Sequence, residues 1–345
     1  MSNILYGGNS TAPTNAGTYA VTANCAANGN YAAVTGGSAG NFVISQATPT
    51  LTVTNTPQTY TGSAIAATVT CSSTGTVSNV LYGGSSTVPT NIGTYAITAN
   101  CASTTNHTAL TGASAGNFVI AAATPTLTIT NTPRTYTGNP IAATVTCSSG
   151  GSVTNIKYGG TSTTPTDAAT YAITADCAAT SNYTALTGSS AGNFVINAAT
   201  PTLTVTNTPQ TYTGSPIAAT VTCSSSGTVS NIKYGGDSTV PTNVGTYAIT
   251  ADCGAITNYT APTGASAGNF VISPATPTLS VSNTPQTYTG SPIAATVTCS
   301  GGGAVTNIKY GGNSNIPTTA GTYAITADCA STTNYTAVTG ASAGN

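Results

Sequence analysis

The chain has 345 residues, of which only 3% are charged: four are Lys or Arg and five are Asp. An ordinary soluble domain has about 25% charged residues. Four basic residues cannot form the basic face that nucleic-acid binding needs, and one His with scattered carboxylates argues against acid–base catalysis. We therefore expect no nucleic-acid partner, no enzymatic activity and no cofactor.

The composition favours strands over disorder, because Thr, Val, Ile and Tyr are frequent and these residues favour β-structure. No stretch approaches 18 consecutive apolar residues, so we expect no membrane-spanning helix. Polar Ser2 and Asn3 follow Met1 directly, so no signal peptide is visible. A secreted protein needs one, and we expect it to be absent from this chain.

An internal repeat of 76 residues, without insertion or deletion, organises the chain. Its boundaries are predicted at the four Ala-Thr-Pro-Thr segments. They give a partial module with only its second half (1–46), three complete modules (47–122, 123–198 and 199–274) and a module lacking its last strand (275–345). We expect one of two explanations for the incomplete ends. Either the chain is a slice of a longer array, or neighbouring subunits supply the missing strands.

Within the module 199–274, apolar and polar residues alternate with period two, as in half-buried strands. The alternating runs are 203–205, 217–223, 232–234, 247–253 and 270–272. Turn sequences rich in Gly, Pro, Ser and Asn separate them, and no run has helical periodicity. The pattern predicts an all-β fold: a tandem array of small antiparallel Ig-like β-sandwiches. Linkers of two or three residues with a Pro should limit bending between modules.

The cysteines are expected to form one structural disulfide per module, because both point inward on the alternation. The predicted pairs are Cys71–Cys101, Cys147–Cys177, Cys223–Cys253 and Cys299–Cys329, each 30 residues apart, and Cys25 is left unpaired. Two Cys per module without a recurring His cannot build a four-ligand zinc site or a Cys–His nucleophile. Disulfides indicate an oxidising, extracellular setting.

A Lys and an Asp occur together in the last three modules and are both absent from the first two. The pairs are Lys157 with Asp176, Lys233 with Asp252, and Lys309 with Asp328; Leu5 and Leu81, with Asn24 and Asn100, replace them in the first two modules. We interpret them as exposed cross-strand ion pairs. The alternative, a Lys–Asp isopeptide crosslink, needs a second nearby carboxyl group, which the last module lacks.

Other candidate sites have plain structural explanations. His107 stands where the other modules have Tyr, and we interpret it as a tolerated loop substitution. Asn-x-Thr glycosylation sequons start at Asn106, Asn182, Asn258 and Asn334, and Asn9 starts another. The Tyr of each Tyr-Gly-Gly turn could stack on sugars, but the alternation places it in the core.

The module sequence resembles a known family. The order Thr211-Tyr212-Thr213-Gly214, Tyr234-Gly235-Gly236, residues 241–251, Asn258-Tyr259 and Phe270-Val271-Ile272 is similar to MBG-type modules, a type of bacterial Ig-like repeat found in large bacterial surface proteins. The resemblance implies tandem extracellular modules of adhesins or surface fibres, without catalysis. The family name alludes to mucin binding, a role to which no residue here can be assigned.

Together these features predict a structural subunit of a bacterial extracellular filament or surface stalk, secreted or held at the cell surface. Low charge favours self-association, laterally or by strand addition between incomplete modules. The alternative is an adhesin repeat region that binds glycan or mucin. We do not expect insertion into a membrane.

Overall fold

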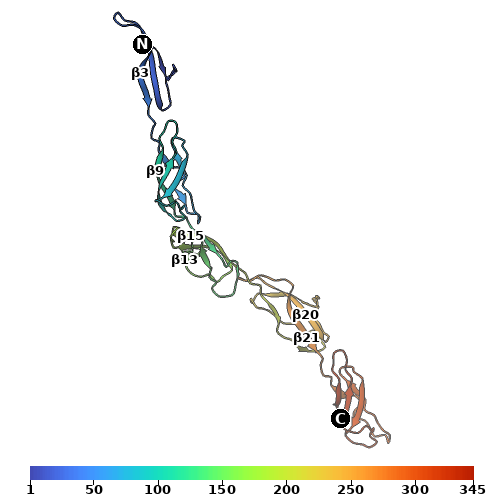
Figure 1. Ribbon diagram of the computed structural model, residues 1–345. Helices are drawn as coiled ribbons and strands as arrows, with labels where there is room; N and C mark the ends of the chain where they lie inside the picture. The colour runs from blue at the N-terminus through green and yellow to red at the C-terminus, as the bar shows by residue number, and fades with distance from the viewer. The chain divides into compact units, whose positions relative to one another are not determined.

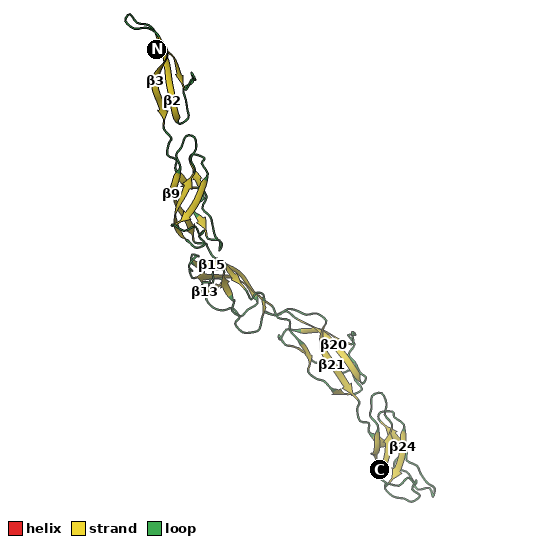
Figure 2. Ribbon diagram, in the orientation of Figure 1, coloured by secondary structure: helices red, strands yellow, loops and turns green.

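A computed structural model describes all 345 residues, and it contains strands and loops but no helix (Figure 2). The chain forms two compact units. The first unit comprises Met1–Asn131, Ala143–Thr163 and Tyr171–Phe194, and the second comprises Thr132–Ala142, Thr164–Thr170 and Val195–Asn345. The middle module contributes to both. The absence of helices and the sheets that recur along the chain confirm the predicted all-β tandem fold.

The first unit begins with a three-stranded antiparallel sheet in residues 1–46. Its strands are β1 (Ser2–Tyr6), β2 (Gly17–Cys25) and β3 (Val34–Ile44), in the order β1-β2-β3. The next module has six strands: β4 (Leu51–Val53), β5 (Gln58–Thr59), β6 (Val69–Cys71), β7 (Val77–Tyr82), β8 (Gly93–Cys101) and β9 (Leu110–Ala121). They form a two-stranded sheet, β4-β6, and a four-stranded sheet, β5-β9-β8-β7.

The middle module, 123–198, repeats this pattern. Its strands are β10 (Leu127–Ile129), β11 (Arg134–Thr135), β12 (Val145–Cys147), β13 (Val153–Tyr158), β14 (Ala169–Cys177) and β15 (Leu186–Asn197). The sheets are β10-β12 and β11-β15-β14-β13. The same order of strands therefore recurs with the sequence repeat.

The second unit contains the module 199–274 and the module 275–345. The former has β16 (Leu203–Val205), β17 (Gln210–Thr211), β18 (Val221–Cys223), β19 (Val229–Tyr234), β20 (Gly245–Cys253) and β21 (Ala265–Ser273). The latter has β22 (Leu279–Val281), β23 (Val297–Cys299), β24 (Val305–Tyr310), β25 (Ile325–Cys329) and β26 (Val338–Gly344), with the sheets β22-β23 and β24-β25-β26. In Figure 1, β20 and β21 lie side by side as an antiparallel pair.

The core of each complete module lies between its two sheets. In the module 199–274, Ile249, Phe270 and Ile272 are at most 1% exposed, and Leu203 and Val205 of the small sheet pack in the same cluster. Burying each large apolar side chain contributes about 1.5–3 kcal/mol. Inward side chains at alternate positions thus hold the two layers together.

Two local differences from the sequence prediction have a physical reason. The run 217–223 is a strand only from Val221, because the Ile217 N–H donates to the Pro241 carbonyl and the Ala219 N–H donates to the Tyr234 hydroxyl. In addition, the unpredicted strand β17 pairs in parallel with the end of β21. It is two residues long, too short to show any alternation.

Candidate functional site: disulfides, bulges and the uncharged surface

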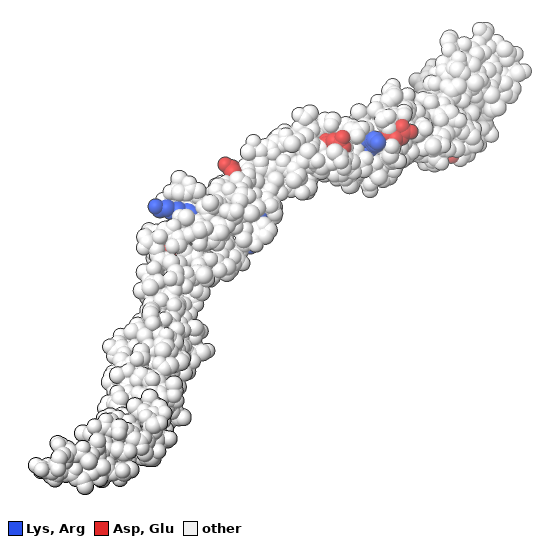
Figure 3. Space-filling view, turned by 90° about the horizontal axis from the view of Figure 1, so that it is seen from above, with Lys and Arg blue, Asp and Glu red and all other residues white.

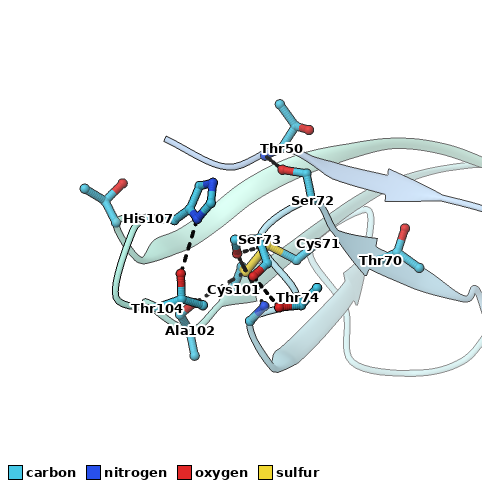
Figure 4. The surroundings of a disulfide bond; sticks show 12 residues. Thr50, Thr70, Cys71, Ser72, Ser73, Thr74, Cys101, Ala102, Thr104 and His107 are labelled. Atoms are coloured by element: carbon cyan, nitrogen blue, oxygen red, sulfur yellow. Dashed lines mark hydrogen bonds between the residues drawn. A yellow bond between two sulfur atoms is a disulfide. The ribbon is translucent and has the colours of Figure 1, made fainter. Parts of the chain in front are cut away.

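The disulfides join the two sheets of each of the four modules that follow residue 46. Cys71 lies in β6 of the small sheet and Cys101 in β8 of the large sheet, and their sulfurs are bonded (Figure 4). The same pairing joins Cys147 to Cys177, Cys223 to Cys253 and Cys299 to Cys329, with Cα–Cα distances of 6.2–6.3 Å. Each bond therefore links the two layers of a module at a fixed place in the repeat.

A serine accompanies the first three disulfides, a feature that the sequence pattern did not reveal: Ser73 and Ser225 are buried, and Ser149 is half-buried. Ser73 is 6% exposed, and its hydroxyl lies 3.1 Å from the Cys71 sulfur and 3.4 Å from the Cys101 sulfur (Figure 4). Two residues later, Gly75 has no room for a side chain, because a Cβ would collide with the Ala102 carbonyl oxygen and the Cys101 sulfur. A Gly four residues after the first Cys recurs in every module with a disulfide. This recurrence is the sequence signal that could have indicated a closely packed turn beside the disulfide.

Cys25 is exposed and is the free cysteine of the chain. Its sulfur lies 3.7 Å from the carbonyl oxygen of Ala26. The thiol is therefore accessible to solvent.

The Lys and Asp side chains that occur together are not direct partners, which corrects the predicted ion pairs. In the β13–β14 pair, Lys157 is opposite Thr174, whereas Asp176 is opposite Thr154. The same offset separates Lys233 from Asp252 and Lys309 from Asp328. An irregularity between Thr154 and Lys157 shifts the register, and plain alternation could not reveal it.

The Asp instead binds backbone and side-chain amides at bulges. Asp176 accepts hydrogen bonds from the Asn155 side chain and from the Gly188 N–H, the latter at 2.7 Å. In the first two modules Asn24 and Asn100 accept the equivalent Gly N–H at 2.8 Å. The recurring role at this position is therefore to hold a glycine with positive φ, and an amide or a carboxylate can fill it.

These hydrogen bonds lower the pKa of two Asp residues below the ordinary value of 3.8. For Asp176 the main cause is the Gly188 N–H, followed by Asn155, and the charge of Lys157 is a smaller cause. For Asp328 the Asn307 side chain is the main cause, followed by the Gly340 N–H. Donors aimed at the charged form stabilise it, so both carboxylates stay ionised to lower pH.

The tyrosines of four Tyr-Gly-Gly turns lie in the core, as the alternation predicted, whereas Tyr6 of the partial module is half-buried. Tyr82, Tyr158, Tyr234 and Tyr310 are 6–7% exposed. The first three pack edge-on against the core Phe of their module at 6.3 Å between ring centroids. Their rings are consequently not available to stack on a sugar.

The surface is nearly free of charge. On the face drawn in Figure 3, a few Lys, Arg and Asp side chains are scattered over an otherwise uncharged surface.

His107 lies in a loop, where its Nδ1 is 3.2 Å from the Thr104 hydroxyl. The structure has no helix able to cross a membrane.

These features define a class of protein: a repetitive region of small β-sandwiches, each complete module carrying a disulfide between its sheets. The chain belongs to the MBG domain family, whose model matches residues 1–48, 49–124, 125–200, 201–276 and 277–344. The resemblance stated from the module sequence is confirmed. The first four matched segments end two residues after the boundaries predicted from the repeat, and the fifth ends at residue 344. No curated protein and no solved structure matches the chain.

Proposed function

We propose that this chain is a structural, non-catalytic part of a bacterial extracellular filament or surface stalk. The observation that carries the proposal is the combination of five consecutive MBG domains with a disulfide between the sheets at the repeat spacing. Disulfides persist in oxidising compartments, which supports a location outside the cell. A module of 76 residues has a small core, and a covalent bond between its sheets compensates for it.

Electron microscopy of native, non-reduced protein tests this proposal, together with immunogold labelling of intact cells. We expect gold on surface fibres or stalks, and an axial repeat that corresponds to one or several modules. Label confined to the cytoplasm, with the cysteines reduced, would overturn the proposal. Saturable binding to a glycan array would instead support the adhesin alternative.

We further propose that the chain associates with copies of itself by strand addition. The module 275–345 has a groove of about 300 Å³ lined by Val281, Ile293, Tyr310 and Ile325, among others. One repeat earlier, the residues equivalent to this lining are Val205, Ile217, Tyr234 and Ile249. They pack in one core with Phe270 and Ile272, which are buried.

A second copy offers a segment of the same sequence in β3, where Phe42 is 45% and Val43 is 59% exposed. Sedimentation of the 345-residue chain should therefore show oligomers that Ile293→Asp abolishes and the control Ile316→Asp, outside the groove lining, preserves. A monomer at all concentrations would overturn self-association and leave the stalk proposal standing.

A further inference from the structure

In each of the four modules after residue 46, the Asn-x-Thr loop contacts the module before it. Within the first unit, the Asn182 Oδ1 accepts a hydrogen bond from the Ile92 N–H at 3.1 Å, and its Nδ2 donates to the Asn91 Oδ1 at 3.1 Å. Asn106 makes the same two contacts with Ala16 and Asn15, at 2.6 and 3.0 Å. The partners are 90 and 91 residues apart, more than one full repeat.

The second unit repeats this arrangement. Asn334 accepts from the Val244 N–H at 2.9 Å and donates to the Asn243 Oδ1 at 3.1 Å. Asn258 accepts from the Ala168 N–H at 2.6 Å and donates to the Asp167 Oδ1 at 2.9 Å. All four sequon asparagines are half-buried, and both polar atoms of each side chain are used.

The same loop also fixes the linker. The carbonyl oxygen of Asn182 accepts the Ala123 N–H at 3.1 Å, and the Thr184 N–H donates to the Ala123 carbonyl at 2.9 Å. Strand β9 ends at Ala121. A single residue therefore lies between the last strand of one module and the anchored first residue of the next.

An aromatic pair completes three of these junctions. Tyr60 packs edge-on against Tyr183, Tyr136 against Tyr259 and Tyr212 against Tyr335, each with 5.4 Å between ring centroids. Tyr31 and Tyr288, which have no such neighbour in this chain, are 79% and 64% exposed. The paired tyrosines are half-buried, so the junction removes aromatic surface from water.

We propose that Asn106, Asn182, Asn258 and Asn334 are junction clamps that restrict bending and twisting between consecutive modules. This deepens the proposed function, because a stalk built of small modules needs stiff junctions. It also assigns the Asn-x-Thr sequons a role other than carrying glycan: a glycan on Nδ2 would displace the contact with the preceding module.

Hydrogen exchange of the full chain tests the clamp at single amides. Asn182→Ala should speed exchange of the Ile92 amide by about fivefold to tenfold, the effect of one hydrogen bond. The buried Ile97 amide should be unchanged. The control Asn193→Ala replaces an exposed strand residue and should change neither. Unchanged exchange at Ile92 in Asn182→Ala would overturn the clamp.

The junction with Asp167 provides a chemical test, because a carboxylate cannot donate a hydrogen bond. Asn258→Asp places a second carboxylate against that of Asp167 and should speed exchange of the Ala168 amide. Asp167→Asn in the same chain should restore slow exchange. Asn182→Asp should be tolerated, because the Asn91 amide can turn and donate. Equal effects of the two Asn→Asp changes would contradict the geometry.

Stiffness is measured on single molecules by electron microscopy. Replacing the four clamp asparagines by Ala should widen the spread of angles between adjacent modules at least about twofold relative to a matched control. That control replaces Asn41, Asn117, Asn193 and Asn269, which are exposed on strands. Equal spreads of angles would refute the clamp without bearing on the proposed extracellular location. Conversely, finding the protein in the cytoplasm would refute the proposed function without bearing on the measured angles.

Discussion

Removal of one disulfide should destabilise its own module and spare the others. In the loop-entropy model, a crosslink with a sequence separation of 30 residues contributes about 3.6 kcal/mol at 25 °C. A module of 76 residues has a typical stability of about 4–11 kcal/mol, so this loss is a third or more of the total. The double variant Cys223→Ala/Cys253→Ala keeps each Cβ and removes only the two sulfurs.

Urea unfolding of the full chain, followed by brief proteolysis and mass spectrometry, measures the effect module by module. With a denaturant slope of about 1–2 kcal/mol per molar, the module 199–274 should become cleavable at about 2–4 M less urea than in the parent chain. The modules that keep their disulfides should not shift. Cys25→Ala, which removes the exposed free thiol, is the control and should shift nothing.

The reasoning would be refuted by a shift below about 0.5 M in the double variant, since the crosslink would then contribute little. A reducing agent offers a second check. It should lower the midpoints of the other three disulfide modules and leave the variant module where it already is.

Three further predictions follow from the site. Tyr234→Phe should cost about 1–3 kcal/mol, because the buried Ala219 N–H loses its acceptor, whereas Tyr247→Phe removes an exposed hydroxyl contact and should cost less. The carboxylate of Asp176 has a lowered pKa in the folded state, so its contribution to stability is present above pH 3.8 and disappears as the pH falls through the folded pKa. In an acid titration of stability, Asp176→Asn should lack this loss. Thiol labelling of non-reduced protein should modify one residue per chain, Cys25, and more than one label would contradict the disulfide pairing.

Much of the fold was predictable because a repeat imposes the same local pattern several times. The 76-residue period shows that each cysteine recurs at one place in the module. The period-two alternation puts both cysteines on inward-facing positions of predicted strands, and the sandwich follows from the same alternation. The buried Tyr82 illustrates this, since its position in an alternating run predicts the core. Such properties depend on neighbours a few residues away.

The site was less predictable where register is irregular. The run that contains Lys157 looks like a simple strand, but the register irregularity between Thr154 and Lys157 separates the lysine from Asp176. The carboxylate therefore binds a glycine N–H twelve residues away. A sequence pattern reports the face of a strand and does not report which residue lies opposite.

The sequence by itself determined the class of fold, the period and the inward position of the cysteines, because period-two alternation and repeat spacing are local or arithmetic properties. The tertiary structure alone decided that the Tyr234 hydroxyl accepts the Ala219 N–H and that Asn182 contacts Asn91 and Ile92 in the module before it. Those hydrogen bonds join residues 15 to 91 positions apart. They form only when folded modules bring the polar atoms within reach, which no local pattern encodes.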